Sequence, residues 1–210
     1  MEIAAKAKRK RGIETTQKIL EAAAELFAHK GFDAVPMSEI AKAVGIKESS
    51  LYNHFAGKAA IRDALFDIFV HGAPECRPRD RDIDAMLEIM QPEEIFKNIL
   101  FYFGSHVSAL LKNTAMIINN EKYKDQKAAS MYYGHVVNEA ADYYERLIRK
   151  MMDRNMVKKV DARLIAEQYN YISIALTKEY FMADNGLADV HSVVKYMIKT
   201  IDFFCAMMKP

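Results

Sequence analysis

The sequence predicts an all-α fold in which a small N-terminal helical unit is joined to a larger helical domain. Gly and Pro are scarce, at 8 and 5 of 210 residues, whereas Met, Tyr and Phe number 13, 11 and 11. Few strand-length runs alternate polar with apolar residues, and apolar residues recur at helical spacing instead. The composition, 51% hydrophobic and 28% charged, is typical of a folded globular chain and excludes a disordered or fibrous one.

The distribution of charge and cysteine limits the compartment and the partners. Residues 1–62 carry eleven Lys or Arg against seven Asp or Glu, a net of +4, whereas the whole chain has a net charge of only +2. This asymmetry suggests a basic end that binds a polyanion. Cys76 and Cys205 show neither metal-site nor secreted-framework spacing, and no run of about 18 apolar residues or signal peptide is found. We therefore expect a cytoplasmic protein with no membrane partner.

The first segment, residues 1–14, is predicted to be a disordered basic arm. It places five positive charges in six positions without apolar periodicity, at Lys6, Lys8, Arg9, Lys10 and Arg11. Two functions remain open for such an arm. It is either a solubilising tail or a segment that follows phosphates or enters a minor groove.

The next segment, residues 15–57, is predicted to contain three short helices. Thr15 or Thr16 can cap the first helix, which ends at Gly31, a residue able to take the left-handed conformation. Its apolar stripe consists of Ile19, Ala23, Leu26 and Phe27. Pro36 suits the first turn of the second helix, and Gly45 ends it.

The third helix, residues 47–55, directs Leu51 and Phe55 inward and leaves a polar outer face. That face carries Lys47, Ser49, Ser50, Tyr52, Asn53 and His54. Two short helices joined at a glycine turn, the second with small hydrogen-bonding side chains, are typical of a helix-turn-helix that reads base edges in the major groove. A small helical bundle with a polar face is the alternative.

The apolar, glycine and aromatic positions of this segment together resemble the DNA-binding domain of the TetR (tetracycline-repressor-type) family. The resemblance covers about 45 residues and lies in Ile19-Leu20-x-Ala22-Ala23-x-x-Leu26-Phe27-x-x-x-Gly31-Phe32, Ile40-Ala41-x-x-x-Gly45-Ile46 and Leu51-Tyr52-x-His54-Phe55-x-x-Lys58. It implies a dimeric transcription regulator whose all-helical C-terminal domain binds a small molecule. The chain departs from the family where Ser or Thr often caps the second and third helices, because Val35-Pro36 and Lys47 stand there.

Residue roles follow from the same resemblance. Four side chains are expected to face bases, namely Lys47, Ser49, Ser50 and Asn53. Four more are expected on the phosphate backbone, namely Thr16, Tyr52, His54 and Lys58.

The remainder, residues 58–210, is predicted to be a helical effector-binding and dimerisation domain. Residues 58–71 form the connecting helix, and a Gly- and Pro-containing loop follows. Helical patterns then resume at about residues 84–90, 93–112, 124–156, 161–182 and 189–208. The last two are apolar on nearly every side and so need cover on two sides, which predicts a homodimer. We expect its interface at Ile172, Leu176, Met197, Ile201 and Phe204, and the resemblance implies the same helix pair.

Methionine and aromatic residues between these helices suggest a pocket for a small, largely apolar effector. The expected ligand-binding residues are Met90, Phe96, Phe103, His106, Met116, Asn120, Tyr132 and His135. Such residues are more often plain core, and that alternative remains open for each of them.

Catalytic and metal motifs are not found, so neither an enzyme nor a cofactor is expected. The chain lacks a Gly-rich phosphate loop, Gly-x-Ser-x-Gly and zinc-type His spacing. We therefore predict a repressor that an apolar effector releases from a double-stranded DNA operator. The alternatives are an effector-independent DNA-binding structural protein and, less favoured, a small helical enzyme.

Overall fold

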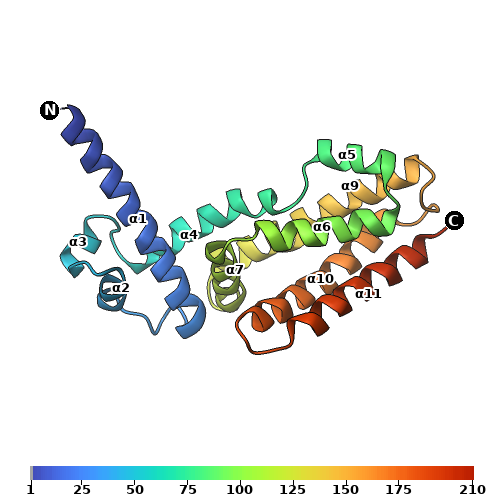
Figure 1. Cartoon of the computed structure of the whole chain (residues 1–210). Helices are drawn as coiled ribbons and strands as arrows, with labels where there is room; N and C mark the ends of the chain where they lie inside the picture. Colours follow the sequence, from blue (N-terminus) through green and yellow to red (C-terminus); the bar gives the residue numbers. More distant parts are fainter. Residues whose placement is uncertain (1) are drawn as a thin grey trace. The chain divides into compact units, whose positions relative to one another are not determined.

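The computed structural model describes residues 2–210, with side chains from Lys10 onward, and these residues form helices joined by short loops (Figure 1). No strand occurs in this described part, which confirms the all-α prediction. The chain divides into two compact units. The N-terminal unit contains the residues up to Ala73 together with Ser108–Ala129, and the C-terminal unit contains Pro74–Val107 and Ser130–Pro210.

The N-terminal unit is built around a core of apolar side chains from five helices. These are α1 (Glu2–Lys30), α2 (Met37–Val44), α3 (Glu48–Tyr52), α4 (Lys58–Gly72) and α7 (Ala109–Glu121). Ile19, Ile40, Leu51, Leu65 and Ile118 are fully buried. The expected stripe of the first helix and the inward position of Leu51 are therefore confirmed.

Helix α1 begins at Glu2, so the described residues of the segment predicted as a disordered arm, residues 1–14, form the start of this helix. Thr15 and Thr16 do not cap the helix. Their hydroxyls donate within it, to the carbonyls of Arg11 at 2.9 Å and Gly12 at 3.0 Å. The segment before Thr15 consists mainly of Ala, Lys, Arg and Glu, which favour helix, and one Gly costs only about 1 kcal/mol.

Glycine turns end the first two helices as expected. Gly31 has φ 87° and Gly45 has φ 75°, both in the left-handed region. After Gly31, the ring of Phe32 packs edge-on against Phe27, with 5.1 Å between centroids. Pro36 occupies the N-cap position of α2 instead of lying in its first turn. Helix α3 is shorter than the predicted 47–55, because Lys47 is its N-cap and Asn53 its C-cap.

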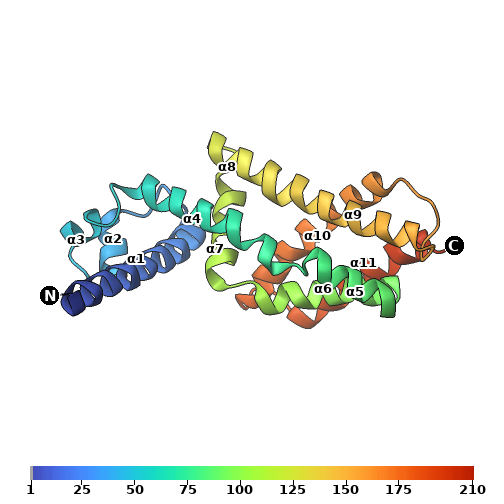
Figure 2. The same ribbon diagram turned by 90° about the horizontal axis from the view of Figure 1, so that it is seen from above.

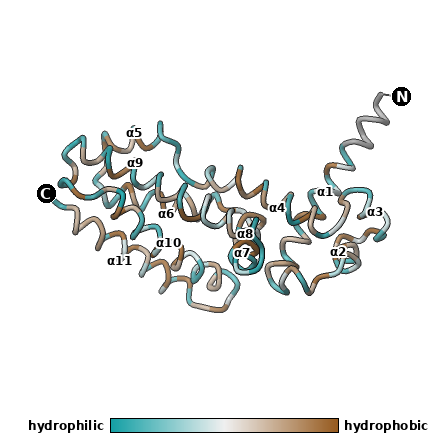
Figure 3. The backbone as a smooth tube through the Cα atoms, turned by 180° about the vertical axis from the view of Figure 1, so that it is seen from behind, coloured by the Kyte–Doolittle hydropathy of each residue, from teal (hydrophilic) through white to brown (hydrophobic). Residues whose placement is uncertain are grey.

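The C-terminal unit packs its helices around a second core. It contains η1 (Pro74–Cys76), α5 (Asp80–Ile89), α6 (Pro92–His106), a π-helix η2 (Tyr132–Asn138), α9 (Glu139–Asp153), α10 (Ala162–Asp184) and α11 (Val190–Met208). Helix α8 (Gln126–Met131) precedes η2, which leads into α9 (Figure 2). Apolar residues recur along α10 and α11 (Figure 3). Asp161 and Asp189 cap these two helices through their carboxylates.

Several boundaries differ from those expected, and two of them affect the division into units. The predicted helix 93–112 ends at His106, because Ser108 caps a new helix, α7, by accepting a hydrogen bond from the Leu111 amide at 3.2 Å. The expected domain boundary at residue 58 also differs, because α4 and α7 belong to the N-terminal unit. Gly72 permits their close approach, since a Cβ there would lie 2.8 Å from the Leu111 side chain.

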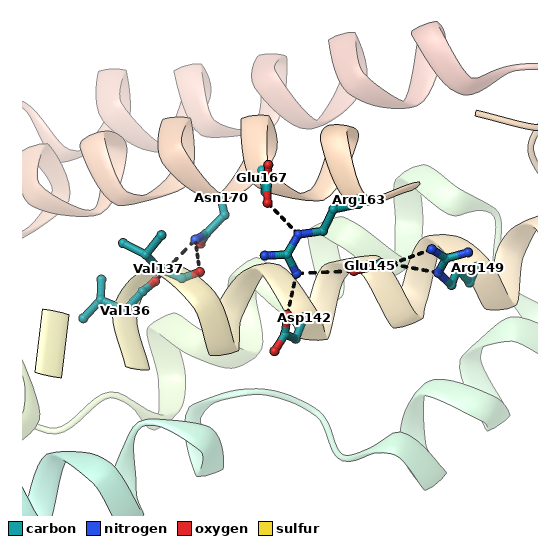
Figure 4. Close-up of polar contacts among 8 residues, drawn as sticks. All are labelled: Val136, Val137, Asp142, Glu145, Arg149, Arg163, Glu167 and Asn170. Carbon is teal, nitrogen blue, oxygen red and sulfur yellow. Dashed lines mark hydrogen bonds and ion pairs between the residues drawn. The ribbon is translucent and has the colours of Figure 1, made fainter. Parts of the chain in front are cut away.

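Polar contacts hold α10 against η2 and α9 (Figure 4). The buried amide of Asn170 donates to the carbonyls of Val136 at 3.3 Å and Val137 at 2.9 Å. Arg163 of α10 forms ion pairs with Asp142 and Glu145 of α9 and with Glu167 of its own helix. A π-helix departs from regular α-helical hydrogen bonding, and here a buried side chain serves two of its carbonyls.

The described helices include none that is long and apolar enough to cross a membrane.

Candidate functional site

Polar side chains lie on the exposed surface of α3, the helix that follows the Gly45 turn in the chain. Lys47, Ser49 and Asn53 are exposed, Tyr52 is 50% exposed, and Ser50 is half-buried. Leu51, which is fully buried, anchors this short helix to the core. The arrangement presents hydroxyl, amide and ammonium groups on one surface, and such groups donate to base edges and phosphate oxygens.

The three other expected DNA-contacting residues take part in contacts within the unit. Thr16 Oγ1 lies 2.9 Å from Nδ1 of His54, which ties α1 to the end of α3. The Lys58 ammonium donates to the carbonyls of Phe32 at 2.6 Å and Asp33 at 3.1 Å, and it lies 4.6 Å from the centre of the Phe32 ring. These contacts hold the loop between α1 and α2 and the end of α3 in place.

An ion pair that the sequence did not indicate anchors α4. Arg62 Nη1 donates to Asp125 Oδ2 at 2.9 Å, and the Arg62 guanidinium lies 4.8 Å from the centre of the Phe32 ring. Only 14% of the Arg62 side chain is exposed. The partners are 63 residues apart in the chain, so no local spacing could have revealed the pair.

The eight expected ligand-binding residues are spread over both units instead of converging. Met116 and Asn120 lie on α7 of the N-terminal unit. In the C-terminal unit, His106 is exposed and stacks on Tyr102 at 3.7 Å, and His135 pairs with Glu139 at 2.8 Å. Met90 and Tyr132 are half-buried at the end of α5 and the start of η2.

Phe96 belongs to the packed core, as the alternative interpretation allowed. Its ring lies 5.0 Å from Tyr169 and 6.1 Å from Tyr144, measured between centroids. Burial raises the pKa of the Tyr144 and Tyr169 hydroxyls above its ordinary value of 10.0. This cluster fills the centre of the C-terminal unit.

Phe103 lines an open pocket between α6, α10 and α11. The pocket has a volume of about 310 Å³. Its walls consist of Leu100, Phe101, Phe103, Gly104, Ser105, Tyr180, Val194 and Met197. Of the eight expected ligand-binding residues, Phe103 is the one that lies here.

Four of the five expected dimer contacts are buried within the chain itself. Leu176 and Met197 belong to a small core cluster, and Ile201 and Phe204 belong to the main one. Ile172 alone of the five is exposed, at 38%. Both sides of these helices are apolar, so the helical period alone did not show which side faces the core of the chain.

A different apolar stripe on each of these packed helices is exposed. On α10 it runs through Leu164, Tyr171 and Met182, and on α11 it runs through Tyr196, Phe203 and Met207. The residues within each stripe lie close to multiples of a helical turn apart, so each set shares one side of its helix. These are large apolar side chains that the chain itself leaves uncovered.

Comparison with known proteins places the exposed polar surface of α3 inside a segment that resembles a known family. Residues 19–65 match the profile described as "Bacterial regulatory proteins, tetR family". The A-factor receptor protein of Streptomyces griseus is 38% identical over 61 residues, which cover 29% of this chain and 22% of that protein. The nucleoid occlusion factor SlmA of Vibrio cholerae is 22% identical over 165 residues, which cover 74% of this chain and 78% of SlmA.

A solved structure from Mesorhizobium loti, described as a TetR-family transcriptional regulator, resembles the whole fold. Its TM-score is 0.66 at 14% identity, and the match covers 95% of this chain and 99% of that one. Residues 19–65 therefore match the TetR-family profile, and the fold of the whole chain is similar to that of a solved structure described as a TetR-family regulator.

Proposed function

We propose that the protein is a dimeric transcriptional repressor that a small, largely apolar effector releases from its DNA operator. The observation that carries the DNA-binding part is the exposed polar surface of α3 behind the Gly45 turn, inside the segment that matches the family. Lys47, Ser49, Ser50 and Asn53 would face bases, and Tyr52 would contact phosphate. Thr16, His54 and Lys58 would mainly position this surface, since each already has a partner within the unit.

The exposed stripes on α10 and α11 support dimerisation through these two helices. Exposed aromatic and methionine side chains on two packed helices favour association with a second copy that buries them. In such a dimer, the two copies of α3 would bind DNA half-sites that lie about one turn of the DNA double helix apart. The operator is therefore expected to be a palindrome.

A selection on random DNA duplexes tests this function. We expect enrichment of a palindromic site, and Ser50→Ala or Asn53→Ala should alter the preferred bases at a cost of about 1 to 3 kcal/mol per contact. Tyr52→Phe should weaken binding to all sequences alike. Failure to enrich any sequence, together with an affinity that does not fall with salt, would contradict the proposal.

Effector-independent DNA binding is the second candidate, and the similarity to SlmA favours it. That protein is named for nucleoid occlusion, and its match extends over most of both chains. The two candidates differ in ligand response. An apolar compound that stabilises the protein and weakens operator binding supports the repressor, whereas stabilisation without any change in operator affinity supports the second candidate.

A further inference from the structure

The first turns of α1 carry a dense set of positive charges that the proposed function does not use. Residues 2–14, which form the basic extension, contain five Lys or Arg against two Glu, so they hold three of the four net positive charges of residues 1–62. They belong to the same continuous helix as the residues that pack into the core, because α1 runs from Glu2 to Lys30. This first part of α1 extends past α2 and α3 (Figure 1).

The described side chains of the basic extension lie outside the core. From Lys10 onward, the first buried side chain of α1 is Ile19, and none from Lys10 to Lys18 is buried. Lys10 lies 4.0 Å from Glu14, in a pair whose side chains are 80% and 58% exposed. Exposed pairs of this kind contribute little to stability. The positive charge of the described part is therefore available to a partner outside the chain.

The helical form of the basic extension determines which polyanion it fits. Its five basic positions are Lys6, Lys8, Arg9, Lys10 and Arg11. Because successive residues of a helix are about 100° apart, these positions are spread around the helix instead of along one side. A helix that lies on a membrane needs an apolar side opposite its basic one, and this pattern leaves none. A helix about 10–12 Å across is also too wide for a minor groove of about 6 Å, so the phosphate backbone and the major groove of DNA remain.

A contact within the N-terminal unit places the basic extension beside the exposed surface of α3. Thr16 Oγ1 lies 2.9 Å from Nδ1 of His54, the residue that follows the C-cap of α3. The basic extension ends two residues before Thr16, and Lys6 is ten residues away from it, which corresponds to about 15 Å along a helix. Duplex DNA has one phosphate for about every 1.7 Å of its axis, so a helix of this length beside α3 can pass several phosphates.

We infer that the basic extension binds phosphates of double-stranded DNA next to the bases that α3 reads, without regard to their sequence. Phosphate contacts from Lys and Arg carry no sequence information. Phosphates would also neutralise like charges that lie three or four residues apart, as at Lys6 and Lys10, a spacing that destabilises a helix. The inference depends on the proposed function only in placing this contact beside the operator bases.

Salt titrations of DNA affinity with the full chain test the inference. The test variant combines Lys8→Gln, Arg9→Gln, Lys10→Gln and Arg11→Gln, because Gln favours helix about as much as Lys and Arg do. We expect the slope of log affinity against log salt to become less steep by about 2 or more per subunit, since each neutralised phosphate contributes about 0.9. A random-sequence duplex and the selected operator should show the same loss.

A matched control removes the same number of charges from exposed positions of the C-terminal unit, namely Arg81→Gln, Arg146→Gln, Lys158→Gln and Lys159→Gln. This control variant should leave the slope nearly unchanged. An equal change in the test and control variants would mean that net charge alone acts. No change in either would mean that the basic extension is a solubilising tail. Both results would overturn the inference.

Further measurements separate phosphate binding from its alternatives. Lys8→Arg with Lys10→Arg keeps every charge and should keep the wild-type slope, and a reduced slope there would count against phosphate binding. Selection with the test variant should return the wild-type preference, since altered preferred bases would mean that the basic extension reads sequence. Binding to phosphatidylglycerol vesicles that the test variant loses, with unchanged DNA slopes, would assign the charges to a lipid surface. A wild-type selection that enriches no sequence contradicts the proposed function, whereas slopes on the random-sequence duplex still decide this inference.

Discussion

At the scale of single residues, the buried amide of Asn170 connects α10 to the π-helix. Only 4% of the residue is exposed, and its two hydrogen bonds serve carbonyls of η2. Asn170→Ala leaves these buried carbonyls without that donor, so we expect the free energy of unfolding to fall by about 1 to 3 kcal/mol. Urea denaturation measures the change. Gln168→Ala, at an exposed position on the same helix, is the control, and equal effects of both would contradict the role of Asn170.

Burial also controls the chemistry of Cys205. It raises the pKa of this thiol to about 12, from an ordinary value of 9.0. The folded thiol therefore keeps its proton where the unfolded one loses it, so stability declines as the pH rises from 9.0 towards about 12. At pH 8 we expect Cys76 and Cys205 to react with a thiol reagent such as Ellman's only after denaturant is added, because both are buried. Rapid reaction of two thiols in the native protein would contradict this.

Residue roles on α3 could be predicted where they depended on local pattern. Leu51 and Gly45 follow from helical period and turn chemistry, and the structure agrees. The contacts of Thr16 and Lys58 could not be predicted, because their partners lie 38 and 26 residues away. The residue type and sequence spacing of a polar side chain near a candidate interface are the same whether that side chain binds DNA or a neighbouring loop.

At the scale of elements, α11 presents two apolar sides that the sequence could not tell apart. Ile201 is 1% exposed and Phe203 is 59% exposed, although they are two residues apart. Phe203→Asp should leave the fold intact and give a monomer, since the stripe would then carry a charge. Ile201→Asp should destabilise the fold by about 3 kcal/mol or more, because it buries an unpaired carboxylate. Sedimentation velocity and thermal unfolding of both variants measure this, and a dimeric Phe203→Asp protein would contradict the proposed interface.

The elements that the sequence missed share a cause. Helix α7 was predicted only in part, as the end of a longer helix, because its break at residues 107–108 contains neither Gly nor Pro and depends on the Ser108 cap. The π-helix η2 is likewise stabilised from outside, by Asn170 of α10. Periodicity within a segment indicates that a helix forms, but contacts from other segments determine where it ends and which type it is.

At the scale of the whole molecule, composition and helical period were enough for the fold class, but the division into units was not predictable. Helix α7 joins the N-terminal unit although the segment Pro74–Val107, which belongs to the other unit, separates it from Ala73. The Arg62–Asp125 ion pair and the Gly72–Leu111 approach are among the contacts that hold it there. Such pairing across an intervening segment has no signature in a single sequence.

The salt dependence of operator affinity tests the proposed DNA complex and distinguishes the roles of Lys47 and Lys58. Each phosphate neutralised contributes about −0.9 to the slope of log affinity against log salt. Lys47 is exposed on α3 and faces the DNA in the proposed complex, so Lys47→Gln removes a positive charge from the interface and should make the slope less steep by up to about 1 for each subunit. The Lys58 ammonium already donates to two carbonyls, so Lys58→Gln should leave the slope unchanged and lower the free energy of unfolding by about 1 to 2 kcal/mol.

Operator titrations between 50 and 200 mM salt, roughly the range over which such contacts are resolved, measure the slopes, and urea denaturation measures stability. Because both substitutions remove one positive charge, a slope reduced by the same amount in both variants would mean that Lys58 leaves its carbonyl partners to bind DNA.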